Sequence, residues 1–250
     1  MAGPGSGPAE GQPRWRRVLL KLSGEILAGE ERHGVHPATL LSIAEQIRDV
    51  RELGCEMAVV VGGGNYIRGA ELVGGGMERA AADYMGMLGT VINALALQDQ
   101  LERLGLHTRV LSAIKMEQVA EPYIRRRAIR HLEKGRIILL AAGTGNPYFS
   151  TDTAAVLRAV ETTCEVLLKA TKVDGVFSAD PARHPEAELY SRLTHQEVLE
   201  RGLRVMDLTA ITLAMENRLP LVVFSVKTAG NMLRILRGET IGTLVEEGAR

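Results

Sequence analysis

The sequence predicts an α/β protein, with a three-layer α/β/α sandwich around a mainly parallel central sheet. Segments of strand length that are apolar on both faces alternate with helical patterns along the chain. Strands of this kind are typical of parallel sheets covered by helices on both sides. Glycine clusters follow three of these strands. Open parallel sheets bind ligands beyond the carboxyl ends of their strands, so these loops are where function is expected.

Each element is predicted from a local pattern. Strands are expected at 17–22, 57–61, 108–112, 136–141, 166–170, 221–225 and 243–245. A helix is expected after Pro37, because Leu40, Ile43, Ala44 and Ile47 repeat at helical spacing. A second helix carries Leu88, Val91, Ile92 and Leu95, and its apolar stripe continues through Leu101 and Leu104. No internal repeat or linker interrupts this alternation, so one domain is expected over residues 14–250.

Composition restricts the class of protein. Lys plus Arg is 30 and Asp plus Glu is 30, so the formal net charge is zero and any anion binding must be local. Residues 1–13 are rich in glycine and proline and predict a disordered tail, not a signal peptide. The apolar runs are much shorter than the roughly 20 residues that a bilayer requires. A cytoplasmic protein without a membrane partner is expected, and nothing in the charge predicts nucleic-acid binding.

The three glycine-rich loops predict phosphate binding. They are Ser23-Gly24, Gly62 to Asn65, and Gly143 to Pro147. Glycine lets the backbone approach a phosphate, and successive N–H groups form anion-binding concavities. A single such loop is more often an ordinary turn, but three of them at strand ends favour phosphate binding. The common nucleotide motifs are absent: there is no Walker A Gly-Lys pair, and Ile67 stands where a dinucleotide fingerprint needs its last glycine.

Charged residues next to these loops are candidates for catalysis. Lys21 lies at the carboxyl end of the first strand, where a transferring phosphoryl group needs charge compensation. Arg68 follows the second loop, Asp152 ends the third, and Lys172 follows a later strand. Each has a structural alternative. Asp152 is suited to capping a helix, Lys21 to extending its ammonium group into solvent at a strand end, and Arg68 and Lys172 to solvated loop or turn positions. The six histidines fall in predicted loops or near helix ends, where surface or capping roles are expected.

Several segments together resemble the bacterial uridylate kinase (UMP kinase) family of the amino-acid kinase superfamily. They are 21–25, 62–69, 83–87, 142–152, 169–181 and 205–208, in family order. Superfamily relatives that act on acetylglutamate, aspartate, glutamate or carbamate share the opening lysine and the glycine loops. The segment at Asp83 and the long loop ending at Asp152 distinguish the UMP kinases. The resemblance implies an amino-acid kinase-like fold and transfer of the ATP γ-phosphoryl group to UMP, giving UDP and ADP in pyrimidine nucleotide (CTP) biosynthesis.

The resemblance also implies roles for individual residues. The residues implied in catalysis are Lys21, Asp152 and Lys172. Those implied in ATP binding are Lys21, Leu22, Ser23, Gly24, Gly64, Arg68, Thr171, Phe177 and Asp180. Those implied in UMP binding are Gly63, Asp83, Thr144, Gly145, Asn146, Pro147, Tyr148, Phe149, Ser150 and Thr151. Mg²⁺ is implied as a cofactor carried on the ATP phosphates, with no dedicated protein metal site.

The family is typically a homohexamer built from dimers, activated by GTP and inhibited by UTP. The stripe from Met85 to Leu104 is a candidate dimer surface, and core packing explains it equally well. The basic run 125–130 could bind an effector phosphate or form a solvated helix face. Two other functions stay open: a kinase acting on a small carboxylate or carbamate, and a protein that binds nucleotides without turnover. The presence of both Lys21 and Asp152 argues against the second.

Overall fold

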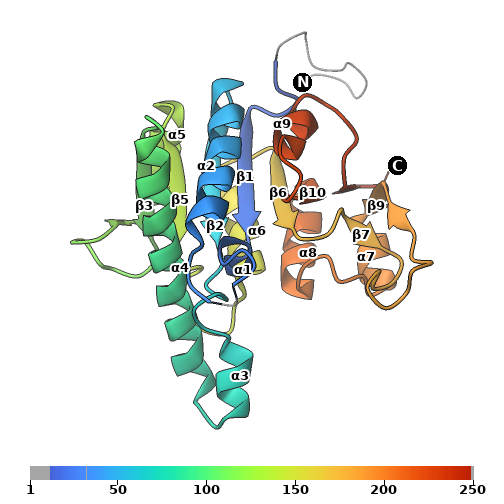
Figure 1. Cartoon of the computed structure of the whole chain (residues 1–250), viewed down its shortest axis with the longest axis horizontal. Helices are drawn as coiled ribbons and strands as arrows, with labels where there is room; N and C mark the ends of the chain where they lie inside the picture. The colour runs from blue at the N-terminus through green and yellow to red at the C-terminus, as the bar shows by residue number, and fades with distance from the viewer. Residues whose placement is uncertain (1–11, 32, 249–250) are drawn as a thin grey trace.

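The computed structural model describes residues 12–31 and 33–248 and has one large sheet of nine strands (Figure 1). The strand order is β4-β3-β5-β2-β1-β6-β10-β11-β9, and neighbouring strands are parallel except for β10 and β11. The strands are β1 (Arg17–Leu22), β2 (Glu56–Val61), β3 (Thr108–Ser112), β4 (Glu121–Pro122), β5 (Ile137–Ala141), β6 (Val166–Thr171), β9 (Arg192–Thr194), β10 (Leu221–Ser225) and β11 (Thr243–Glu246). A separate antiparallel pair consists of β7 (Val176–Phe177) and β8 (Leu189–Tyr190).

Helices cover both faces of the sheet, so the predicted three-layer sandwich is confirmed. They are α1 (Gly24–Leu27), α2 (Pro37–Glu52), α3 (Gly69–Gly74), α4 (Arg79–Arg103), α5 (Arg125–Glu133), α6 (Thr151–Glu161), α7 (His195–Glu200), α8 (Leu208–Glu216) and α9 (Asn231–Leu236). All seven predicted strands are present. The short strands β4, β7, β8 and β9 have two or three residues each, too few for a hydrophobic pattern to identify them. The predicted tail, residues 1–13, lies outside the described residues except for its last two.

The core has two halves, one on each face of the sheet. Val18, Leu20 and Leu22 of β1 point into the half formed with α1, α2, α4 and α9. Leu19 points into the other half, formed with α5, α6, α7 and α8. Side chains alternate along a strand, so Lys21 shares the face of Leu19. This alternation directs a charged side chain toward α6.

The apolar stripe predicted for α4 is only partly buried in the structure. Its buried row is Met87, Val91, Ala94, Leu97 and Leu101, which packs against the sheet. Leu88 and Ile92 belong to a neighbouring row and are exposed by 50% and 47%. The stripe read from the sequence therefore spans two faces of the helix, one in the core and one in contact with solvent.

Helix α4 is also the only helix among the described residues that is long and apolar enough to cross a membrane. Only strand-length apolar runs were predicted from the sequence, because Thr90 and Asn93 divide the apolar middle of α4. The buried row packs on the sheet as in a core helix. Figure 1 shows α4 and α3 extending beyond the end of the sheet.

Candidate functional site

Three charged side chains meet at the carboxyl ends of β1 and β6. The Nζ atom of Lys21 lies 2.6 Å from Asp152 Oδ1, and the Nζ atom of Lys169 lies 2.8 Å from Asp152 Oδ2. Lys169 also donates a hydrogen bond to the carbonyl oxygen of Val205. Lys21 is only 7% exposed, and the side chains of Lys169 and Asp152 are largely buried. A buried cluster of two cations and one carboxylate carries a net positive charge, which suits it to an anionic ligand.

The fold brings these three residues together through strand register and a helix start. Lys21 and Lys169 are register partners on the parallel strands β1 and β6, so their side chains project from the same face of the sheet. Asp152 lies in the first turn of α6, which packs on that face. Ser150 caps the helix by accepting a hydrogen bond from the backbone N–H of Thr153. A carboxylate in a first turn is stabilised by the helix dipole.

Burial and charge act in opposite directions on the pKa values of Asp152 and Lys169. Burial alone would raise the pKa of the Asp152 carboxyl, but the two lysine ammonium groups outweigh it and lower this pKa below its ordinary value. Burial lowers the pKa of Lys169 below that of an ordinary lysine; attraction to Asp152 opposes this shift, and repulsion from Lys21 adds to it. The Asp152 carboxyl between the two lysine side chains is therefore ionised at neutral pH.

Lys172, which the sequence reading placed in the catalytic set, does not join this cluster. Its side chain lines a separate pocket with His36 and Lys227, on the face of the sheet covered by α2. Lys169 instead occupies the position that was expected for Lys172. Lys169 itself was not predicted as a site residue. The available signal was a lysine near the end of an apolar strand, the same pattern that singled out Lys21.

The first two glycine loops pack against each other at backbone distance. A Cβ atom on Gly24 would lie 2.6 Å from the carbonyl oxygen of Gly62, and one on Gly63 would lie 2.3 Å from the carbonyl oxygen of Gly86 in α4. The nearest atom to a Cβ on Gly64 would be Glu25 Cγ at 3.9 Å, an ordinary van der Waals contact. The glycines at 24 and 63 are therefore needed for close packing, whereas the packing around Gly64 would admit a side-chain methyl group. Leu22 and Ser23 lie where β1 joins α1, and the Leu22 side chain belongs to the core.

A buried pair of amides fixes the second loop. Asn65 and Asn93 exchange hydrogen bonds of 2.9 and 2.7 Å, and Asn93 also donates to the carbonyl oxygen of Gly62. Both side chains are fully buried. Asn93 was not predicted, because its role depends on contact between α4 and a loop some 30 residues earlier in the chain.

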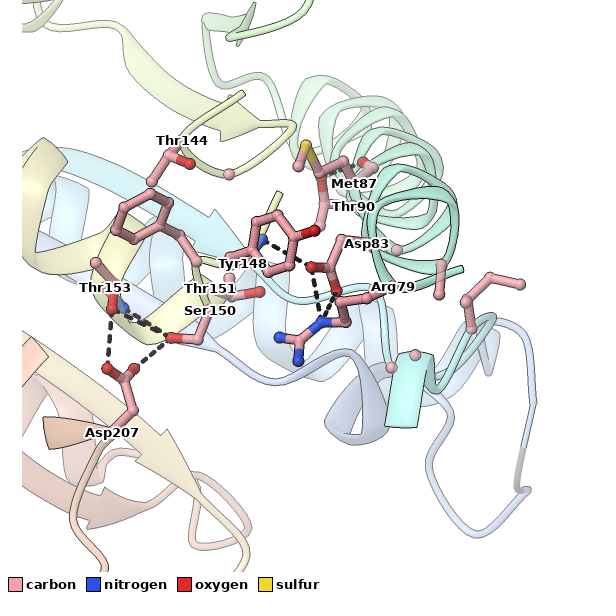
Figure 2. A pocket seen from close by; sticks show the side chains of 18 of the residues that line it. Arg79, Asp83, Met87, Thr90, Thr144, Tyr148, Ser150, Thr151, Thr153 and Asp207 are labelled. Carbon is pink, nitrogen blue, oxygen red and sulfur yellow. Dashed lines mark hydrogen bonds and ion pairs between the residues drawn. The ribbon is translucent and has the colours of Figure 1, made fainter. Parts of the chain in front are cut away.

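A pocket of about 420 Å³ lies between α4 and the loop that precedes α6 (Figure 2). Its lining includes seven of the ten residues predicted for UMP: Gly63, Asp83, Thr144, Tyr148, Phe149, Ser150 and Thr151. Gly64, predicted for ATP, lines it as well. Gly145, Asn146 and Pro147 do not line this pocket. Gly145 packs against Ala113, and Asn146 faces an apolar groove beside α8.

Asp83 organises one wall of this pocket (Figure 2). It accepts a hydrogen bond of 2.7 Å from the backbone N–H of Tyr148, whose φ of 71° lies in the left-handed region. Arg79, one turn earlier in α4, donates from Nε to both Asp83 oxygens at 3.0 and 2.9 Å. Asp83 thus links α4 to the 143–151 loop. Arg79 is a lining residue that the sequence reading missed.

A second pocket of about 700 Å³ lies beside β6 and β7. It contains three of the residues predicted for ATP, namely Thr171, Phe177 and Asp180, and Lys169 lines it too. Since Thr151 and Thr153 flank Asp152 and line the first pocket, the Lys21–Asp152–Lys169 cluster lies between the two pockets. Arg68, also predicted for ATP, lines neither of them. Its guanidinium pairs with Glu25 at 3.0 Å and Glu71 at 3.3 Å.

Asp207 is a further acidic residue of the first pocket. It accepts hydrogen bonds from Ser150 Oγ and from Thr153 Oγ1, and it caps α8 through the backbone N–H of Ala210. Figure 2 shows Asp207, Ser150 and Thr153 on the side of the pocket opposite Asp83. The segment that contains Asp207 was recognised in the sequence, but the contact between Asp207 and Ser150 depends on the tertiary structure.

A sequence model of the amino acid kinase family matches residues 16–225, which span the strands and loops of both pockets. The chain belongs to the amino acid kinase family. Within this family, its structure is similar to those of UMP kinases. The UMP kinase from Bacillus anthracis is 40% identical, with a TM-score of 0.91, and the match covers 94% of this chain and 97% of that one. The resemblance noted in the sequence is confirmed at this level.

Two further solved structures agree with this placement. The UMP kinase from Ureaplasma parvum is 35% identical, with a TM-score of 0.88, over 94% of this chain and all of that one. The uridylate kinase from Archaeoglobus fulgidus is 28% identical, with a TM-score of 0.70, over 91% and 99% of the two chains. The matches cover nearly the full length of each chain, so both pockets lie within the shared fold.

Proposed function

We propose that this chain is an ATP-dependent UMP kinase that transfers the γ-phosphoryl group of ATP to UMP and releases UDP and ADP. The observation that carries the proposal is the buried Lys21–Asp152–Lys169 cluster between two pockets. The similarity to UMP kinases at 35–40% identity supports UMP as the acceptor.

The first pocket is proposed to hold UMP. Asp83 supplies a carboxylate that can accept hydrogen bonds from ribose hydroxyl groups, provided that Arg79 yields part of its contact. Thr144 and Thr151 offer hydroxyl groups, and Phe149 offers an aromatic surface to the base. Gly63 and Gly64 lie where the UMP phosphate would approach the backbone.

The second pocket is proposed to hold the ATP nucleoside, with Thr171, Phe177 and Asp180 as contacts. From there the triphosphate would extend past Lys169 toward Lys21, Ser23 and Gly24 at the end of β1. Arg68 would have to leave its pairs with Glu25 and Glu71 to reach a phosphate. Its role in ATP binding is therefore proposed only for the bound state.

The chemistry requires positioning and charge compensation. An oxygen of the UMP phosphate attacks the γ-phosphorus of ATP, the bond from that phosphorus to the β–γ bridging oxygen breaks, and ADP leaves with the electron pair. A phosphate monoester has a second pKa of about 6, so the attacking oxygen is already anionic at neutral pH and no general base is needed. Lys21 and Lys169 would stabilise the transferring group, and Asp152 would fix both ammonium groups.

Mg²⁺ is proposed to arrive bound to ATP. Both oxygens of Asp152 lie against lysine ammonium groups and leave little room for a metal. Among the described residues, no group of three or more His, Cys, Asp or Glu side chains could hold a metal ion. The phosphate oxygens of ATP and water would then be the main ligands, as is usual for magnesium on nucleotides, and Mg²⁺ would neutralise phosphate charge.

Assembly, regulation and cellular context are further parts of the proposal. Tyr84, Leu88 and Ile92 form an exposed apolar row on α4, which suits an interface with a second copy and the proposed homohexamer. GTP and UTP are proposed as effectors, with the basic helix α5 as a candidate phosphate surface. The reaction would supply pyrimidine nucleotide (CTP) biosynthesis in the cytoplasm.

The decisive experiment measures ADP release from Mg-ATP with UMP, CMP, dUMP, carbamate or acetylglutamate as the acceptor, each with and without GTP. The proposal predicts turnover with UMP and none with carbamate or acetylglutamate. Turnover with carbamate or acetylglutamate alone would support a kinase that acts on a small carboxylate or carbamate. UMP binding without ADP release would support a nucleotide-binding protein without turnover.

A further inference from the structure

The loop that forms one wall of the first pocket begins with an unfavourable backbone turn. Ala142 and Gly143, directly after β5, have φ angles of 60° and 56°, so both are left-handed. This conformation is unfavourable for alanine, because its Cβ atom crowds the following carbonyl group. Residues 143–151 follow this turn and carry Thr144, Tyr148 and Ser150 into the pocket. The position of the whole segment therefore depends on what holds the turn.

Two buried side chains hold the turn from opposite sides. Thr90 of α4 accepts a hydrogen bond of 2.7 Å from the backbone N–H of Ala142. Arg158 of α6 donates from Nη2 to the carbonyl oxygen of Gly143 at 3.3 Å. Thr90 is 4% exposed and Arg158 is 7% exposed. Buried hydrogen bonds of this kind restrict an otherwise unfavourable backbone to one conformation.

Besides the bond to Gly143, two contacts fix the Arg158 guanidinium. Its Nη1 atom lies 2.7 Å from Glu161 Oε2, and its Cζ atom lies 3.9 Å from the centre of the Tyr123 ring. The Tyr123 hydroxyl donates to the same Glu161 oxygen at 2.7 Å. A planar guanidinium can make the ion pair, the ring contact and the bond to Gly143 at once, whereas a lysine ammonium group cannot.

We propose that Arg158 is a positioning residue that sets the acceptor-binding loop, residues 143–151, without touching the substrate. This proposal rests on the proposed function, because it takes UMP as the acceptor. Arg158 is not among the residues that line the first pocket, so its effect is exerted through the Gly143 carbonyl. Helix α6 then has two tasks: its first turn holds Asp152 at the lysines, and its last turns hold the loop.

The test compares Arg158→Lys with Arg234→Lys, the same substitution at a helical arginine that pairs with Glu239 and lines neither pocket. Hydrogen–deuterium exchange of residues 143–151 in the ligand-free protein should quicken by about tenfold in R158K, as expected for loss of one charge-assisted hydrogen bond. The Kd for UMP should rise by a similar factor, with the Kd for ATP within about twofold of wild type. R234K should change none of these values.

A folded R158K protein with wild-type exchange over 143–151 would overturn the proposal, and so would equal losses of UMP and ATP affinity. The exchange measurement needs no substrate, so it stands even if the wild-type protein fails to phosphorylate UMP, a failure that would count only against the proposed function. Should R158K not fold, Glu161→Gln weakens the support of Arg158 and leaves the guanidinium in place. Faster exchange of the same segment in E161Q is then expected, and unchanged exchange would overturn the proposal.

Discussion

Lys21 and Lys169 are register partners on adjacent parallel strands, and each binds a different oxygen of the Asp152 carboxylate. Two ammonium groups this close repel each other, and the carboxylate between them offsets that repulsion. The arrangement keeps two lysine side chains together at the carboxyl ends of β1 and β6, between the pockets proposed for donor and acceptor.

Asp152→Asn should lower kcat by about 100-fold or more, because the lysines lose the charge that positions them near the transferring group. The KM for UMP should change much less. Steady-state kinetics with Mg-ATP and UMP provides the measurement. Asp99→Asn is the matched control, since Asp99 pairs with Arg103 on the exposed side of α4 and lines neither pocket. Comparable kcat in D152N and D99N would contradict the assignment.

Lys169→Met and Lys172→Met distinguish the site read from the sequence from the site in the structure. K169M should reduce kcat by about 100-fold or more, because it removes a cation at the transferring phosphate. K172M should keep kcat within about threefold, because Lys172 lines a different pocket. Kinetic assays of both variants under identical conditions decide between them. A large loss in K172M with little change in K169M would reverse the two roles.

Much of the fold was accessible from the sequence, because runs of buried aliphatic residues predict strands in a parallel sheet. The site was accessible only in part. The sequence singled out Lys21 and Asp152, but choosing Lys169 over Lys172 requires the register of β6 against β1. The contacts of Asp207 and Arg158 join segments far apart in the chain, so no local pattern contains them. The buried face of α4 could not be predicted either, because its apolar residues fall on two rows and only the packing identifies the buried row.

Gly63→Ala should destabilise the protein by about 1–3 kcal/mol, because the added methyl group would overlap the carbonyl oxygen of Gly86. Urea unfolding followed by circular dichroism measures the change in the free energy of unfolding. Gly74→Ala in α3 is the control, because nothing lies within 4 Å of its Cβ position. Equal stability of G63A and G74A would show that the loop and α4 are not in close contact.

His195 should make stability depend on pH. The sequence reading gave it a surface or capping role, but its ring is buried and contacts the carbonyl oxygen of Leu219 at 3.0 Å. Burial lowers the pKa of His195 below its ordinary value. The unfolded chain therefore takes up a proton below about pH 6.5 that the folded chain does not, and stability falls as the pH drops from there through the lower, folded-state pKa.

His195→Gln should remove this contribution and flatten the decline of stability with falling pH, relative to its own value at pH 7.5. Urea unfolding between pH 5 and pH 7.5 measures the slope, with exposed His184→Gln as the matched control. A slope in H195Q as steep as in wild type and H184Q would contradict the assigned cause.

Leu88→Asp with Ile92→Asp should reduce the mass of the assembly in solution, because two charges would enter the apolar row on α4. Light scattering coupled to size-exclusion chromatography gives that mass. Leu208→Asp is the comparison, because Leu208 is an exposed leucine on α8, away from this row. An unchanged mass in the α4 double variant would exclude this row as the interface.

The most direct test of the central claim is ³¹P NMR of Mg-ATP and UMP incubated with the protein. UDP and ADP are expected to appear in equal amounts as ATP is consumed, and K169M should slow the formation of both by about 100-fold or more. ATP consumption that does not depend on UMP, or UDP formation unaffected by K169M, would contradict phosphoryl transfer at the Lys21–Asp152–Lys169 cluster.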